Sequence, residues 1–149
     1  MGGLAQRLGL GHRTHLSWAL YDVANSAFFT IVVTAVFPIY FSTAYVAREA
    51  PAGAVEEVLA GFRSDATGAL SVTTALALAA AAVLAPLIGA VADGAPVKKR
   101  ALALFAAIGA AATMSLAVIE PENWTSLAIA FAVANVGAAV SIVLYDSIL

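Results

Sequence analysis

Three polar side chains stand in an otherwise apolar stretch between Ser17 and Phe41. They are Asp22, Asn25 and Ser26, whose i, i+3 and i+4 spacing places them on one face of a helix. A charge at the centre of a membrane helix costs about 2.5–3.5 kcal/mol on insertion scales, so polar groups there usually line a water-filled cavity. This face is a candidate solute path. The alternative is that Asp22, close to the start of the stretch, lies in the membrane interface.

A second set of candidates surrounds a short basic loop. Gly89 and Asp93 come before Lys98, Lys99 and Arg100. A carboxylate at a helix end beside three cations could form a charge network that breaks and re-forms when helices move, which makes these residues gate candidates. The alternative is an ordinary basic loop that only sets the orientation of the chain.

A third pair of candidates, Asn135 and Asp146, lies in the last apolar segment. Val-Ala-Asn and Leu-Tyr-Asp, which occur around Asp22, recur there in the opposite order. Such short repeats also arise by chance in an apolar segment. Our hypothesis is that Asp22 and Asp146 face one cytoplasmic vestibule.

Composition decides which class of protein must hold these residues. Hydrophobic residues make up 62% of the chain and charged residues 11%, against about 25% charged in soluble domains, so a membrane protein is expected. A net charge of −2 argues against a nucleic-acid partner. The chain has no cysteine, serine–histidine–acid set or metal-ligand cluster, so we predict no catalytic residue, metal or cofactor.

Four segments are long and apolar enough to cross a bilayer, which takes about 20 residues. They are roughly residues 17–43, 68–92, 101–119 and 124–149, separated by a long polar loop at 44–67 and two short loops. Within the long loop, "GAVEEVLAGFRSD" could form a short amphipathic helix on the outer surface or a solvated loop. Their alanine-rich, non-alternating sequences favour helices over barrel strands. The predicted fold is an all-α membrane protein, with residues 1–16 as a cytoplasmic N-terminal segment.

Lysine and arginine predict the orientation of these spans. Five fall on one side of a four-span arrangement and two on the other: Arg7, Arg13, Lys98, Lys99 and Arg100 against Arg48 and Arg63. We therefore expect a multi-pass protein of the bacterial plasma membrane with its N-terminus in the cytoplasm.

Small residues at four-residue spacing predict where helices approach closely. Three such sets are Ala130, Ala134 and Ala138; Ala75, Ala79 and Val83; and Gly109 with Thr113. A general alanine bias is the alternative explanation. Pro38 and Pro86 lie inside predicted spans and are expected to kink them.

The first span carries the string W-x-L-Y-D-x-A-N-S-A-F from Trp18 to Phe28. With it, "APLIGAVADGAPVKKR" and "ANVGAAVSIVLYDSIL" resemble the opening third of a major facilitator superfamily transporter. The sequence is most similar to the vacuole-effluxer-like branch, relatives of the yeast vacuolar amino-acid effluxer. The resemblance implies four helices of the N-terminal six-helix bundle and transport by alternating access.

The resemblance also implies roles and partners. Gly89 would allow close helix packing and Asp93 would help to hold one face shut, although Gly94, Pro96 and Val97 depart from the superfamily pattern. The expected partners are the lipid bilayer, a small solute such as an amino acid, a coupling proton and the remainder of the chain, since the sequence resembles a fragment. The alternative function is a four-span membrane subunit with an assembly or structural role; an intramembrane enzyme ranks third.

Overall fold

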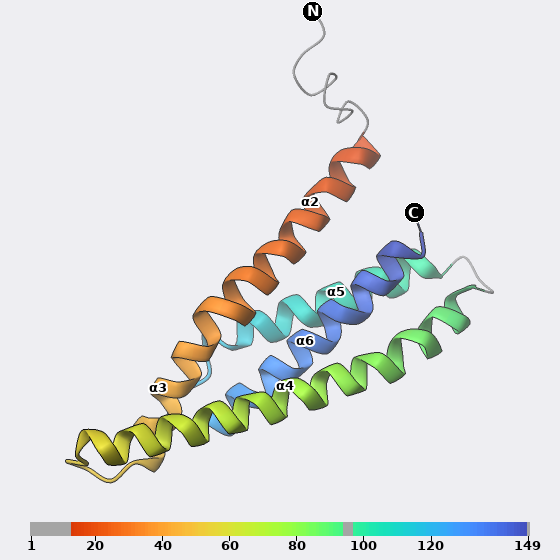
Figure 1. Cartoon of the computed structure of the whole chain (residues 1–149). Helices are drawn as coiled ribbons and strands as arrows, with labels where there is room; N and C mark the ends of the chain where they lie inside the picture. The colour runs from red at the N-terminus through yellow and green to blue at the C-terminus, as the bar shows by residue number, and fades with distance from the viewer. Residues whose placement is uncertain (1–12, 94–96, 149) are drawn as a thin grey trace, which may run out of the picture. The chain divides into compact units, whose positions relative to one another are not determined.

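The structure, a computed structural model, describes residues 13–93 and 97–148 (Figure 1). In order, its elements are α2 (Arg13–Ala27), the π-helix η1 (Phe28–Val36), α3 (Phe37–Glu49), α4 (Glu56–Asp93), α5 (Lys98–Ser115) and α6 (Trp124–Asp146). Every element of the described residues is helical, which confirms the predicted all-α class. The chain divides into two compact units, Met1–Pro38 and Ile39–Leu149, which we describe separately.

The first unit holds α2 and η1, which follow one another without a break. In η1 the hydrogen bonds reach back five residues instead of four: the Phe37 backbone N–H donates to the Val32 carbonyl, and the Thr34 hydroxyl donates to the Phe29 carbonyl at 2.8 Å. None of the nine residues of η1 is buried. η1 ends at Val36, two residues before Pro38, so the helix type changes close to this proline. The predicted kink at Pro38 stays a prediction.

The second unit is organised around α6. Both α4 and α5 pack along α6, whereas they touch one another only slightly. Figure 1 shows α6, in blue, between the green α4 and the cyan α5. Ten of the 23 residues of α6 are buried, including Leu127, Phe131, Val140 and Leu144. This helix therefore forms the core, against which its two neighbours bury one face each.

Gly109 of α5 and Gly137 of α6 let these two helices approach closely. A Cβ atom added to Gly137 would lie 2.7 Å from the Gly109 nitrogen and 2.8 Å from its Cα. Only glycine fits there, because real Cβ atoms do not approach backbone so closely. Small residues allow this kind of contact in membranes, where apolar side chains gain little from meeting each other.

The predicted small-residue faces are correct on α6 and wrong on α4. Ala134 and Ala138 are buried in α6, as expected, and Ala130 is half-buried. On α4 the buried set is Ala77, Ala81 and Ala85, whereas the predicted residues Ala75, Ala79 and Val83 are all exposed. The two sets lie two residues apart, about 200° around the helix. In an alanine-rich segment the spacing fits several faces equally well, so the sequence could not select one.

The predicted polar loop at residues 44–67 is mostly helical. Helix α3 continues to Glu49 and α4 begins at Glu56, so only residues 50–55 connect them. Glutamates in the first turn of α4 suit the positive end of the helix dipole, and Glu56 forms an ion pair with Arg63 two turns later. With 38 residues, α4 is about 57 Å long, so its first turns extend beyond a hydrocarbon core of about 30 Å unless the helix tilts.

Among the described residues, three helical stretches are long and apolar enough to cross a membrane: Leu16–Glu49, Glu56–Val91 and Trp124–Asp146. The span predicted at 101–119 corresponds to α5, which begins with Lys98, Lys99 and Arg100 and ends at Ser115. With three charged residues in its 18-residue length, α5 is too polar to count among the helical stretches that could cross a membrane. The fourth span stays a prediction.

Candidate functional site

The polar face predicted on the first span lies within α2. Asp22, Asn25 and Ser26 all belong to one uninterrupted α-helix, so their spacing does place them on one face. The side chains of Asp22 and Ser26 are exposed, and Asn25 is half-buried. Helix η1 begins two residues after Ser26.

The polar residues of α6 have a different setting. Asn135 is 3% exposed, and its Nδ2 donates to the Phe131 carbonyl at 2.9 Å. Ser141 is 1% exposed, and its hydroxyl donates to the Ala138 carbonyl at 2.8 Å. Both side chains thus bond to carbonyls of their own helix in the core of the unit. In hydrocarbon every polar group needs such a partner, which makes these bonds a requirement of burial.

The predicted vestibule would join Asp22 to Asp146. Asp146 is the last residue of α6 and is exposed. Asp22 belongs to the first unit and Asp146 to the second, so their meeting in one vestibule stays a prediction. Asn135 lies about 16 Å deeper along α6 than Asp146, at 1.5 Å per residue.

Of the gate candidates, Lys98 receives a definite partner. Its Nζ donates to the Ser147 carbonyl at 3.3 Å, and Ser147 caps the C-terminus of α6. A cation at the end of a helix offsets the partial negative charge of its free carbonyls. The start of α5 is therefore attached to the end of α6, a contact 49 residues apart in sequence that the basic run alone did not indicate.

The other gate candidates lie near that end. Lys99 and Arg100 are exposed in the first turn of α5. Asp93 is the last residue of α4, and Gly89 is half-buried one turn before it, with open space where a Cβ would stand. Gly94 and Pro96, at which the sequence departs from the superfamily pattern, lie outside the described residues. The charge network itself stays a prediction.

The opposite end of the second unit holds an attachment that the sequence analysis missed. The Trp124 indole Nε1 donates to Glu49 Oε1 at 2.9 Å, and the rings of Tyr45 and Trp124 are 5.0 Å apart. Phe41, which is fully buried, lies edge-on to Trp124 at 6.2 Å. The end of α3 is thus fastened to the start of α6. Aromatic residues near predicted span ends were a visible signal, but it did not indicate which of them pair.

A polar recess of about 520 Å³ lies beside that attachment. It is lined by Arg48, Glu49, Glu120, Glu122, Asn123, Trp124 and Thr125. Across the part of the chain that the structure describes, no group of three acidic or histidine side chains is placed to hold a metal ion. The recess lies at the polar end of the unit, where α6 begins. The Asn123 side chain caps this helix by accepting a hydrogen bond from the Ser126 N–H.

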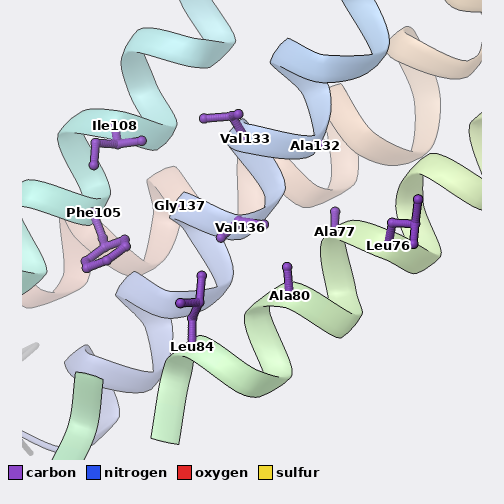
Figure 2. Close-up of a pocket in the computed structure, with 10 residues that line it drawn as sticks. All are labelled: Leu76, Ala77, Ala80, Leu84, Phe105, Ile108, Ala132, Val133, Val136 and Gly137. Carbon is purple, nitrogen blue, oxygen red and sulfur yellow. The ribbon is translucent and has the colours of Figure 1, made fainter. Parts of the chain in front are cut away.

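A second cavity, of about 350 Å³, lies where α4 and α5 diverge over α6 (Figure 2). Its lining is almost wholly apolar: Leu76, Ala77, Ala80, Leu84, Phe105, Ile108, Ala132, Val133, Val136 and Gly137. Figure 2 shows Leu84 and Ala80 pointing from α4 toward Val136 of α6. Such walls offer no hydrogen bond to a polar solute, so this cavity differs from the polar path predicted on α2.

Comparison with known proteins identifies the family of the chain. A sequence model of the family described as "Vacuole effluxer Atg22 like" matches residues 11–149. The chain is 35% identical over 133 residues to an "uncharacterized MFS-type transporter YxiO" of Bacillus subtilis (strain 168). That match covers 89% of the chain and 28% of the relative, so the chain spans less than a third of the relative's length. No solved structure matches the chain.

Proposed function

Since the chain belongs to the vacuole effluxer Atg22-like family, we propose that it forms the first part of a secondary transporter of the major facilitator type. Its apolar helices and its transporter relative make it a multi-pass integral membrane protein. The observation that carries the proposal is the polar face of α2, formed by Asp22, Asn25 and Ser26 within a helical stretch that is otherwise apolar enough to span a membrane.

The proposed mechanism is alternating access of a small solute, with amino-acid efflux as the leading class. A polar face on a spanning helix supports this function, because its side chains can replace the hydration of a polar solute while the outer faces of the bundle stay apolar. The apolar cavity between α4, α5 and α6 could not perform this task. The energy source in the proposal is an ion gradient, with protons as the coupling ion.

The test is transport by the full-length gene product. Membrane vesicles from cells that overproduce it would be loaded with radiolabelled amino acids, one at a time, and the loss of label followed with and without an uncoupler. We expect faster efflux of at least one amino acid than from empty-vector vesicles, and loss of the difference with the uncoupler. A purified, folded full-length protein that moves no small solute would favour the assembly role instead.

The gate proposal concerns Asp93, at the end of α4, with Lys99 and Arg100 nearby in sequence. Asp93→Asn in the full-length protein should reduce transport by about tenfold while leaving its amount in the membrane unchanged, because a lost charge-assisted contact is worth about 1.5–3 kcal/mol. Asp65→Asn is the matched control, since Asp65 is an exposed carboxylate in an early turn of the same helix. Equal transport by the two variants would contradict a gate role.

A further inference from the structure

The π-helix η1 is unusual in length and in place. π-Helices occur mostly as single-turn bulges in α-helices, frequently at functional sites. Here nine consecutive residues, Phe28–Val36, are π-helical in the middle of a stretch that is apolar enough to span a membrane. Two bonds support it: the Phe37 N–H to the Val32 carbonyl, and the Thr34 hydroxyl to the Phe29 carbonyl.

The two segments that flank η1 have different features. On the C-terminal side, α3 is packed and fastened: Phe41 and Ala44 are buried, and Glu49 accepts the Trp124 indole hydrogen bond. On the N-terminal side, α2 carries the polar face of Asp22 and Ser26, which are exposed. The boundary between the two compact units falls at Pro38, two residues after η1 ends.

A π-helical segment can change the partners of its backbone hydrogen bonds while remaining a helix. If one turn tightens from i−5 to i−4 hydrogen bonds, the helix on one side turns relative to the other by about the angle of one residue, on the order of 100°. Pro38 has no backbone N–H to donate to a carbonyl of the preceding turn. One backbone hydrogen bond fewer therefore has to change partner when η1 tightens.

We propose that η1 is a rotary joint. When it tightens, the polar face of α2 turns about the helix axis, while α3 stays fastened to α6 through Glu49 and Trp124. The purpose of the rotation rests on the proposed function, since it would turn Asp22, Asn25 and Ser26 toward and away from the solute path. The joint itself can be tested without any measurement of transport.

The test uses thiol labelling to measure which positions of α2 and α3 are accessible. Single cysteines are placed in turn at positions 20–27 and 39–47 of the full-length protein, in a background free of other cysteines. The labelling rate with a membrane-permeant maleimide gives a helical profile for each segment. Thr34→Val removes the side-chain bond that spans five residues, and Thr43→Val, which removes an ordinary four-residue bond to Ile39, is the matched control.

We expect Thr34→Val to shift the labelling maxima in 20–27 by one position and to leave the profile of 39–47 unchanged. Thr43→Val should shift neither profile. A second pair of variants tests the same joint by length. Deleting Val33 should leave both profiles in place, because η1 absorbs the lost residue by tightening, whereas deleting Ala24 from the α-helical part should shift positions 20–23 by one.

Two results would overturn the joint. One is a wild-type profile at 20–27 in the Thr34→Val protein. The other is a one-position shift on deletion of Val33, or failure of that variant to insert when the Ala24 deletion inserts. A folded protein that shows the expected shifts but transports no solute would leave the joint intact and refute only the proposed function.

Discussion

Asn25 and Asn135 are both asparagines inside apolar helices, yet the structure gives them opposite settings. Asn135 is buried in the core helix α6 and donates to a carbonyl of the same helix. Asn25 is half-buried on the polar face of α2, between exposed Asp22 and Ser26. A polar residue in a membrane helix can therefore serve packing or a water-accessible path, and its surroundings decide which. Our central claim combines the structure with the proposed function: α6 holds α4 and α5 together, and we propose that α2 carries the solute path.

The largest loss of stability is expected from a substitution at the glycine contact between α5 and α6. Gly137→Ala places a Cβ within 3.0 Å of the Gly109 backbone and the Phe105 carbonyl, so α5 and α6 must separate. Overpacking of this kind costs about 1–3 kcal/mol, which we expect as a lower midpoint in thermal unfolding of the purified protein. Gly68→Ala is the control, because nothing lies within 4 Å of its new methyl group. Equal midpoints for the two variants would show that the glycine contact does not hold α6 in place.

A smaller effect is expected where α3 is fastened to α6. Trp124→Phe keeps the aromatic contact with Tyr45 but removes the hydrogen bond to Glu49, which should lower stability by about 1 kcal/mol. Trp18→Phe, which leaves this attachment untouched, is the control. In the Trp18→Phe background Trp124 is the remaining tryptophan of these 149 residues. Its fluorescence in this segment, produced on its own, should then respond to Glu49→Gln; an unchanged spectrum would argue against the bond.

The smallest of the effects on stability is expected at the other end of α6. Lys98→Gln removes a cation from the helix C-terminus and should cost about 0.3–1 kcal/mol, an effect that salt weakens. Lys99→Gln, at the exposed neighbouring position, should change the unfolding midpoint less. If Lys99→Gln lowers the midpoint more than Lys98→Gln does, the stabilising charge belongs to Lys99, and the role assigned to Lys98 is contradicted.

The sequence was most informative where composition and spacing leave a single answer. A chain with 62% hydrophobic residues had to be helical in the membrane, and one uninterrupted helix had to place Asp22, Asn25 and Ser26 on one face. The sequence failed where several answers fit equally well. Alanines at four-residue spacing occur on more than one face of α4, so the predicted face was wrong.

Other features depend on contacts that no local pattern reports. The bond from Lys98 to Ser147 and the ring contact of Tyr45 with Trp124 join residues 49 and 79 positions apart. The polar stretch before Gly68 was predicted to be a loop because of its charges, with a short amphipathic helix as the alternative. In the structure Glu56 and Arg63 lie in the first turns of the 38-residue helix α4. The π-helical pairing of η1 leaves no mark in a run of valines, threonines and phenylalanines.

The central claim is tested most directly by replacing the two asparagines separately in the full-length protein. Solute efflux from vesicles and the thermal unfolding midpoint would be measured for Asn25→Ala and Asn135→Ala. We expect Asn25→Ala to reduce efflux by about tenfold with an unchanged midpoint. Asn135→Ala should lower the free energy of unfolding by roughly the 0.6 kcal/mol typical of membrane hydrogen bonds, which is seen as a lower midpoint, with efflux nearly intact. Loss of efflux in Asn135→Ala, with full activity in Asn25→Ala, would contradict this division between α2 and α6.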